Sequence, residues 1–281
     1  MIFGEWLKKG EARLSVGPHA ERAKQDAELL LRHVTGLDRA ALLTRGTEAL
    51  STSMAATYGE LLERRLGGEP IQYIVGETEF YGLRFRVNRD VLIPRPETEH
   101  LVEKAIALAE RFERARIVDV GTGSGAIAVA LAHALIEAEI TAVDVSDAAL
   151  AVAKENAQLN GVERRIRWRS GDLLEGLAER FEIVVSNPPY VPGGDRDSMA
   201  VEVREYEPGL ALFAGEDGLD VYRRLIPASF DALVSGGWIA LEIGYGQAAG
   251  VGGLLEASGF VQVEFTRDLQ GIERVAAALR V

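Results

Sequence analysis

The sequence predicts an α/β fold in which a mostly parallel, seven-stranded sheet follows a small helical domain. Strand-like and helix-like segments alternate from about residue 95 to the end of the chain. The first 72 residues instead show helical periodicity and little strand character. A glycine-rich turn, residues 121–125, joins the first strand of the alternating part to a helix. Repeated strand–helix units cover both faces of a parallel sheet with helices, so we expect ligands at the carboxyl ends of the strands.

Composition places the chain among globular proteins and excludes several kinds of site. Its 281 residues are 47% hydrophobic and 26% charged. The chain has no cysteine, which excludes disulfides, thiolate metal ligands and cysteine nucleophiles. Its four histidines lack ligand spacing, so we expect no metal site. The start of the chain lacks the apolar core of a signal peptide, and no later run is long enough for a membrane span. We therefore expect a cytoplasmic protein with no membrane partner.

The charge balance weighs against a nucleic-acid substrate. The formal net charge is -12, whereas proteins that bind a nucleic-acid backbone usually present a basic face. Residues 1–72 hold ten basic and ten acidic side chains, so the excess negative charge lies in the rest of the chain. We therefore expect no direct contact with nucleic acid.

The helical domain is predicted to span residues 1–72. In residues 20–36 the apolar positions recur at helical spacing. The stripe that they form consists of Ala23, Ala27, Leu30, Leu31 and Val34. Gly36 ends this helix, and a second helix from Ser53 stops at Gly67 and Gly68. Such a domain beside an active-site edge is expected to recognise the substrate.

Residues 73–92 are predicted to form a β-hairpin linker, and residues 93–281 a catalytic domain. The linker alternates apolar and polar residues around two glycines, Gly76 and Gly82. In the catalytic domain we predict helices over residues 97–110, 124–135, 147–161 and 217–237. The strands are predicted over residues 115–121, 139–145, 165–172, 181–187, 238–244, 261–268 and 274–281.

The turn in "VDVGTGSGAIAVA" is the first candidate ligand site. Gly121, Gly123 and Gly125 follow a strand and open a helix, where glycine permits close ligand approach and the helix N-terminus favours an anion. Asp144 ends the next strand 21 residues after Gly123, the spacing of an acid that binds a ribose. With Ala126 the same residues also fit the fingerprint of a nicotinamide dinucleotide site, so this turn alone leaves two cofactors open.

Asp172 ends the third strand, in "SGDLL", where it is placed to accept a hydrogen bond from an adenine amino group. A cap for the following turn is the alternative interpretation. The fourth strand ends in "SNPPY", residues 186–190. Proline cannot donate to a sheet, so the strand stops there and the chain leaves it as a stiff, extended segment. A hydride-transfer enzyme has no need of such a segment.

An amino-group methyltransferase does need it. The lone pair of a planar nitrogen is delocalised, so the nitrogen is a poor nucleophile until two acceptors hold its hydrogens. The Asn187 side-chain oxygen and the Pro188 carbonyl are suited to be those acceptors, fixed in place by the prolines. The Tyr190 ring can stack on the planar group and tolerate developing positive charge. This chemistry favours S-adenosylmethionine over nicotinamide as the cofactor.

Five sequence stretches together resemble one known family. They are "LIPRPETE", "NPPY", "EVREYEPGLALFAGEDGLDVYRRL", "LEIGYGQ" and "DLQGIERV". The chain resembles the peptide chain release factor N5-glutamine methyltransferases, the HemK/PrmC family, over essentially its whole length. This resemblance implies a class I, Rossmann-like fold and a cytoplasmic enzyme. It implies methylation of the glutamine in the Gly-Gly-Gln motif of release factors, with S-adenosylhomocysteine as the second product.

The resemblance also implies roles for individual residues. The donor loop would consist of Gly121, Thr122, Gly123, Ser124 and Gly125. Asp144 would hold the donor ribose, while Asp172 and the backbone of Leu173 would face the adenine, although relatives often carry a large aromatic at the position of Leu173. The target glutamine would be held by Asn187, Pro188, Pro189 and Tyr190. For Arg95 and Glu97 both ligand contact and a solvated, capped loop remain open.

Two other functions remain in competition. The first is methylation of an adenine or guanine amino group in nucleic acid, because Asn-Pro-Pro-Tyr serves that chemistry equally well. The net charge and the absence of a large base-recognition domain argue against it. The second is a non-enzymatic module that binds S-adenosylmethionine, and the intact Asn-Pro-Pro-Tyr segment argues against that.

Overall fold

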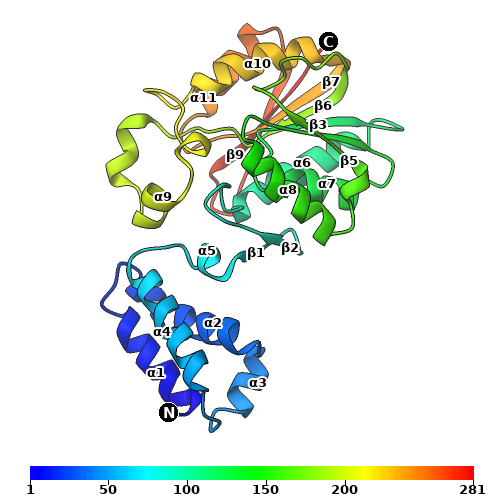
Figure 1. The fold of residues 1–281 in the computed structure, drawn as a ribbon. Coiled ribbons are helices and arrows are strands. Elements are labelled where there is room, and N and C mark those ends of the chain that lie inside the picture. Colours follow the sequence, from blue (N-terminus) through cyan, green and yellow to red (C-terminus); the bar gives the residue numbers. More distant parts are fainter. The chain divides into compact units, whose positions relative to one another are not determined.

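The computed structural model describes residues 1–281 and consists of two compact units (Figure 1). The N-terminal unit comprises Met1–Gly76 together with Met199–Tyr206. The sheet unit comprises Glu77–Ser198 and Glu207–Val281. The chain therefore leaves the sheet unit once, contributes eight residues to the N-terminal unit, and returns. None of the helices has both the length and the apolar character needed to cross a bilayer.

The N-terminal unit contains helices and, apart from one isolated bridge between Ile2 and Ala49, no β-structure. Its helices are α1 (Phe3–Leu14), α2 (Ala23–Thr35), α3 (Arg39–Thr44), α4 (Thr52–Leu66), α5 (Ile71–Val75) and α9 (Val201–Tyr206). The predicted stripe on α2 is confirmed, because Ala23, Ala27, Leu30 and Leu31 are buried. Gly36 ends α2 in the left-handed conformation, with φ 68°.

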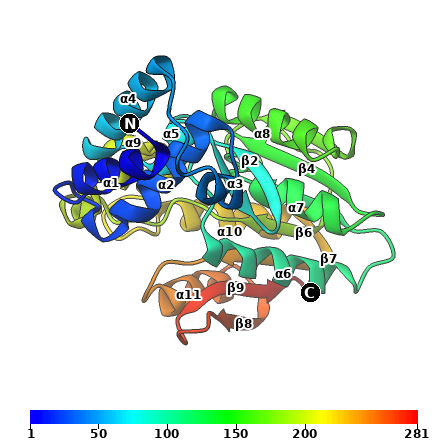
Figure 2. The same cartoon turned by 90° about the horizontal axis from the view of Figure 1, so that it is seen from below.

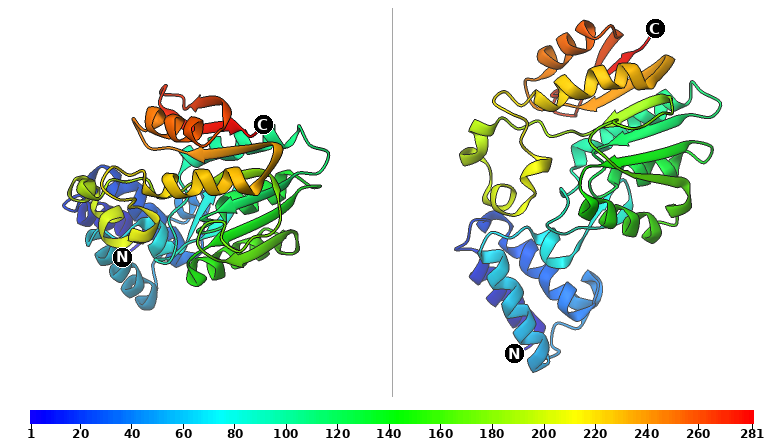
Figure 3. Two further views of the ribbon diagram at one scale, coloured as in Figure 1. Left: turned by 90° about the horizontal axis from the view of Figure 1, so that it is seen from above. Right: turned by 45° about the horizontal axis from the view of Figure 1, so that its top comes forward.

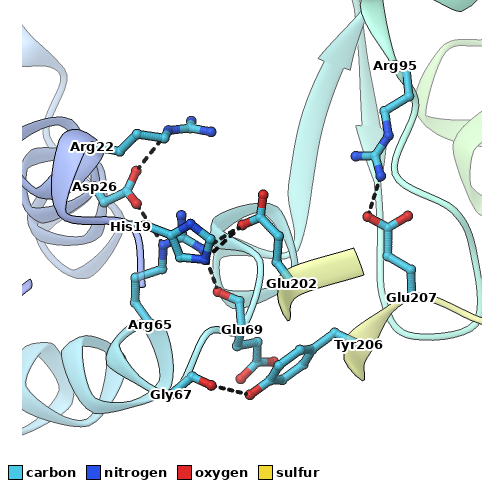
Figure 4. A network of polar contacts seen from close by, with 10 residues as sticks. All are labelled: His19, Arg22, Asp26, Arg65, Gly67, Glu69, Arg95, Glu202, Tyr206 and Glu207. Atoms are coloured by element: carbon cyan, nitrogen blue, oxygen red, sulfur yellow. Dashed lines mark hydrogen bonds and ion pairs between the residues drawn. The ribbon is translucent and has the colours of Figure 1, made fainter. Parts of the chain in front are cut away.

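Helix α9 was not predicted, because six residues are too few to show a helical period. A buried cluster of charges attaches it to the N-terminal unit (Figure 4). Arg65 donates to Asp26 at 2.7 Å and to Glu202 at 2.9 Å. Tyr206 donates to the Gly67 carbonyl at 3.0 Å. Gly68 makes room for α9, since a Cβ at this position would lie 2.9 Å from Cγ1 of Val201.

The linker prediction was partly wrong. Tyr73–Val75 were expected to begin the hairpin, but they lie in α5, which ends at Gly76 with φ 79°. The hairpin itself consists of β1 (Glu77–Phe80) and β2 (Leu83–Arg86). Its two-residue turn has positive φ at both positions, as right-handed strand twist favours.

The seven-stranded sheet has the order β5-β4-β3-β6-β7-β9-β8, which confirms the predicted fold class. The strands are β3 (Arg116–Val120), β4 (Glu139–Asp144), β5 (Ile166–Ser170), β6 (Phe181–Ser186), β7 (Leu233–Glu242), β8 (Val261–Arg267) and β9 (Glu273–Leu279). Strands β5, β4, β3, β6 and β7 pair in parallel with their neighbours, whereas β9 is antiparallel to β7 and β8. The β8–β9 pair forms one edge of the sheet, beside α11 (Ala248–Ala257) (Figures 2 and 3).

Helices cover both faces of the sheet (Figure 1). Helices α6 (Glu99–Ala109), α7 (Ala126–Ala134) and α8 (Asp147–Leu159) pack on one face, and α10 (Asp220–Ala232) and α11 on the other. Neighbouring strand residues point to opposite faces, so Ile117 packs with the first group and Val118 with the second. Sequence order passes from β3 outward to β5 and then returns to β6, and such a reversal is where α/β sheets bind ligands.

The helix predicted over residues 217–237 is too long. Helix α10 ends at Ala232, and Leu233 already pairs with Phe181 in the sheet. The glycines interpreted as the end of the helix, Gly236 and Gly237, lie within β7. Gly236 has φ 81°, next to a register shift between β6 and β7, so the two glycines accommodate a bulge in the strand. Helix α11 was also not predicted.

Candidate active site

The carboxyl ends of β3, β4, β5 and β6 border a pocket of about 250 Å³. Seven of the predicted site residues line it: Gly121, Gly123, Asp144, Asp172, Leu173, Asn187 and Pro189. Thr122, Ser124 and Pro188 are buried and Tyr190 is partly buried, and none of these four residues lines the pocket. The topology thus brings residues from four separate strand ends to one site, within the sheet unit.

The glycine loop needs glycine for two different reasons. Gly121 and Gly123 have φ of 71° and 55°, and apart from the adjoining residues no atom lies within 4 Å of the position that a Cβ would occupy. A side chain there would therefore be strained and would extend into open space beside the pocket. Gly125 is different, because a Cβ would lie 3.0 Å from the Cβ of Ala153 in α8. Gly125 thus permits close helix packing.

A buried acid that the sequence analysis did not select holds the loop. Asp119, in β3, is fully buried and accepts hydrogen bonds from the Thr122 hydroxyl at 2.6 Å and the Ala128 N–H at 3.1 Å. Burial raises the pKa of the Asp119 carboxyl to about 7, although these two bonds lower it. The signal in the sequence was a single acid inside an otherwise apolar strand.

Asp144 is fixed against the loop. Its Oδ2 accepts a hydrogen bond from the Gly123 N–H at 2.8 Å, and its Oδ1 accepts one from the Ser146 N–H at 2.9 Å. Each carboxylate oxygen has two lone-pair sites, so both can still accept a hydrogen bond from a bound molecule. The side chain lines the pocket, where it offers this pair of acceptors.

Asp172 has a partner that the sequence did not suggest. Its Oδ2 accepts a charge-assisted hydrogen bond of 2.6 Å from Arg224 of α10, and Arg224 also lines the pocket. The next residue, Leu173, has φ 54°, which is uncommon for a residue with a side chain. Asp172 and Leu173 both line the pocket.

Three neighbours hold the end of β6 and the segment that follows it. Ser186 donates to the Val120 carbonyl at 2.6 Å, which ties the end of β6 to β3. Asn187 Nδ2 donates to Thr98 Oγ1 at 3.1 Å, so the amide oxygen of Asn187 points away from Thr98. The Tyr190 carbonyl accepts a bond from Gln247 at 3.0 Å. Thr98 and Gln247 were not predicted as site residues.

The Tyr190 hydroxyl lies 3.3 Å from Oε1 of Glu242, the last residue of β7. Burial, together with the nearby Glu242 carboxylate, raises the pKa of Tyr190 above its ordinary value. Burial also raises the pKa of Glu242 to about 7, while hydrogen bonds from Thr98 and Tyr190 lower it. Glu242 is a second acid that the sequence analysis did not select, although it ends a strand at this edge.

Arg95 forms an ion pair of 2.6 Å with the buried carboxylate of Glu207 (Figure 4). Both residues belong to the sheet unit, and neither lines the pocket. Glu97 is exposed and also lies outside the pocket lining. A direct contact of Arg95 or Glu97 with a ligand stays a prediction.

Comparison with known proteins identifies the family. Residues 5–76 match the model of the PrmC N-terminal domain, and residues 98–204 match that of the methyltransferase small domain. A release factor glutamine methyltransferase of Deinococcus radiodurans is 44% identical over 91% of this chain and 90% of its own length. One from Moorella thermoacetica is 42% identical over 100% of this chain and 99% of its own.

A solved structure supports the fold independently. The hMettl16 catalytic domain, crystallised with an RNA hairpin, has a TM-score of 0.59 and covers 82% of this chain and 83% of its own. Its identity to this chain is 18%, so the likeness concerns the fold of a class I methyltransferase. The chain belongs to the release factor glutamine methyltransferases, which use S-adenosylmethionine as methyl donor.

Proposed function

We propose that this protein transfers a methyl group from S-adenosylmethionine to the side-chain amide nitrogen of the glutamine in the Gly-Gly-Gln motif of peptide chain release factors. The observation that carries the proposal is the position of Asn187 in the same pocket as Gly121, Gly123 and Asp144. The side chain of Asn187, which can hold an amide, thereby lies beside the residues that suit the nucleoside part of the donor. The family of the chain supplies the class of substrate.

The residues of the pocket fit the donor. Gly121 and Gly123 leave the space beside them open, and Asp144 offers two acceptors for the ribose hydroxyls. Asp172 faces the same pocket as an acceptor for the adenine amino group, in competition with Arg224. When bound, S-adenosylmethionine supplies a methyl group on a positively charged sulfur, and its transfer to nitrogen leaves S-adenosylhomocysteine and one proton.

The target amide has two hydrogens, and the end of β6 offers two acceptors for them. We assign one hydrogen to Oδ1 of Asn187 and the other to the carbonyl of Pro188. Pro188 is buried, and Ser186 before it is bonded to Val120, so this carbonyl is preorganised. Held in this way, the nitrogen can become pyramidal and present its lone pair. The Tyr190 ring packs on the planar amide and tolerates the positive charge that develops.

The substrate-recognition role of residues 1–72 is part of the same proposal. So are a cytoplasmic location and the absence of direct contact with nucleic acid or membrane. The net charge of -12 supports a protein substrate over a nucleic acid.

One labelling experiment tests the proposal against its alternatives. The protein is incubated with methyl-labelled S-adenosylmethionine and either a bacterial release factor or total RNA. We expect label in the release factor, located by mass spectrometry as one added CH₂ on the Gly-Gly-Gln glutamine. A release factor with glutamate at that position is the matched control and should stay unlabelled. Label in RNA would instead assign the nucleic-acid function, and label in neither would favour a binding module.

A further inference from the structure

Glu242 is a buried carboxylate at the end of β7 that the proposed chemistry leaves unexplained. The residue is 2% exposed, and its Oε2 has no hydrogen-bond partner. The positive charge of Arg274 lowers the pKa of Glu242, but this side chain is already paired with Asp268 at 2.8 Å. Burying a carboxylate without a paired cation is strongly unfavourable, so a glutamate at this position needs a reason in the site itself.

Two hydroxyls contact the Glu242 carboxyl, and both lead to the segment after β6. Tyr190 donates to Oε1 over 3.3 Å. The Thr98 hydroxyl is the second side-chain hydrogen-bonding group at this carboxyl, and it lowers the pKa of Glu242. Thr98 Oγ1 in turn accepts a hydrogen bond from Asn187 Nδ2 at 3.1 Å. Glu242 therefore connects Asn187 and Tyr190, the two side chains that the proposed chemistry places against the target amide.

The direction of these bonds follows from the donors that each group has. Asn187 Nδ2 can only donate, so Thr98 Oγ1 is the acceptor. Thr98 then has one hydrogen of its own, and an ionised Glu242 accepts it. In this arrangement the Asn187 nitrogen is held toward Thr98. Its oxygen, the atom that an amide N–H requires, is left on the pocket side.

Resting on the function proposed above, we propose that Glu242 is a positioning residue for methyl transfer. As a carboxylate it accepts hydrogen bonds from Thr98 and Tyr190, and through Thr98 it fixes the Asn187 oxygen toward the target amide. Glu242 does not line the pocket, so it acts through these neighbours and not on the reacting nitrogen.

The charge state of Glu242 makes the inference sensitive to pH. Burial, together with the nearby Glu97 carboxylate, raises the pKa of Glu242, and Thr98, Tyr190 and Arg274 oppose the rise; the result is a pKa of about 7. Below this value a protonated Glu242 has lost its charge, so it accepts the hydrogen bonds from Thr98 and Tyr190 less strongly. The rate constant kcat should therefore rise with pH through about 7, while a glutamine side chain in the substrate does not titrate there.

The first test is Glu242→Gln in the full-length protein. The variant keeps the size of the side chain but removes its charge, which weakens the hydrogen bonds from Thr98 and Tyr190. We therefore expect kcat to fall about 10- to 100-fold, as for a misplaced reacting group. The KM for S-adenosylmethionine should stay within about twofold, and the rise of kcat near pH 7 should disappear. The unfolding temperature should be equal or higher, because an unpaired buried charge is removed. An unchanged kcat at equal stability would overturn the inference.

Thr98→Val supplies the matched second variant, since valine has the shape of threonine without its hydroxyl. If Glu242 acts on Asn187 through Thr98, the double variant should lose clearly less activity than the product of the two single losses. Losses that multiply fully would show that the two residues act independently, and would contradict the proposed connection.

A measurement without any methyl acceptor separates this inference from the proposed function. NMR of the Asn187 side-chain amide reports how firmly its hydrogens are held. Hydrogen exchange of this amide should be about tenfold or more faster in Glu242→Gln than in the wild type, because opening becomes easier. Equal exchange would overturn the positioning role, whatever the substrate proves to be. Failure of the wild type to methylate a release factor would instead overturn the proposed function.

Discussion

Arg65 of α4 donates a hydrogen bond of 2.9 Å to Glu202 of α9, although 137 residues separate them in the chain. The guanidinium is 1% exposed and also binds Asp26 at 2.7 Å. His19 Nε2 lies 3.3 Å from the same Glu202 carboxylate (Figure 4). A segment that begins nine residues after Tyr190 is thereby anchored in the N-terminal unit. Its attachment depends on charge, because no residue of α9 is fully buried.

Arg65→Met should strongly destabilise the N-terminal unit. It leaves Asp26, 2% exposed, as a buried carboxylate without its main partner, and removal of one member of a buried pair costs about 3–5 kcal/mol. Unfolding in urea, followed by circular dichroism, measures the change. Arg13→Met is the matched control, because Arg13 pairs with Glu63 in an exposed ion pair, and its loss should have a much smaller effect. Equal effects of the two substitutions would contradict the importance of the buried cluster.

Asp144→Ala should weaken binding of S-adenosylmethionine by about 1.5–3 kcal/mol, the contribution of hydrogen bonds to a charged group. The substitution also removes the acceptor of the Gly123 N–H, so the glycine loop loses a support. Isothermal titration calorimetry measures the affinity. Asp147→Ala removes the same charge from an exposed position in the first turn of α8 and should bind the donor normally. Donor affinity that is unchanged in Asp144→Ala would remove this residue from the proposed site.

The parts of the site that were predictable share a local cause. The carboxyl ends of parallel strands meet at one edge, so Asp144, Asp172 and Asn187 could be placed together from strand boundaries alone. The glycine loop was recognisable because its spacing belongs to one turn between β3 and α7. The α2 stripe likewise followed from helical periodicity within one segment.

The parts that were not predictable depend on contacts between distant segments. Thr98 meets Asn187 across 89 residues, and Tyr190 meets Glu242 across 52. No local period records such pairs, and Glu242 was simply the last polar residue of a predicted strand. Arg224 was hidden for the same reason, since it reaches Asp172 from α10 on another part of the chain.

Asp119→Asn should change how stability depends on pH. Burial raises the pKa of Asp119 from 3.8 to about 7. Between these values the folded protein keeps a proton that the unfolded chain has lost. This group therefore makes folding less favourable as pH rises, by about 1.4 kcal/mol per pH unit. Asparagine lacks the effect, so the variant should gain stability relative to the wild type between about pH 5 and pH 7.

Unfolding in urea at several pH values in this range checks the prediction. Glu182→Gln is the control, because Arg116 holds the pKa of Glu182 below its ordinary value. The stabilisation from that pair is fully present at any pH above the ordinary pKa of a glutamate, and it is lost only when the pH falls below that pKa. Glu182→Gln should therefore differ from the wild type by a constant free energy of unfolding between about pH 5 and pH 7. A constant difference for Asp119→Asn as well would mean that Asp119 does not titrate there.

Asn187→Ala should separate chemistry from donor binding. It removes one of the two acceptors assigned to the target amide, so kcat should fall by about 10²-fold or more, the scale of losing one preorganised group. Binding of S-adenosylmethionine, measured by calorimetry, should change little by comparison. Asn187→Asp keeps an acceptor and adds a charge, and it should retain reduced but measurable activity. Normal turnover by the alanine variant would refute the role assigned to Asn187.

Substrate selectivity tests the whole arrangement at the end of β6. A release factor with glutamate at the target position has no amide hydrogens for Asn187 and Pro188 to accept, and its anion would lie beside the Asn187 oxygen. It should not be methylated. Asparagine keeps the amide but shortens the side chain by one methylene, which displaces the nitrogen by about 1 Å and should lower the rate by about 10²-fold. A short oligonucleotide presents an adenine amino group on a larger ring system, which the pocket should exclude by size.

The measurement is a competition assay in which all four substrates are present at equal concentration with limiting labelled donor. Preference for glutamine in its Gly-Gly-Gln setting is the expected outcome. Comparable methylation of the oligonucleotide would instead assign Asn187 and Tyr190 to a nucleobase, and would leave the net charge of -12 without a functional reason.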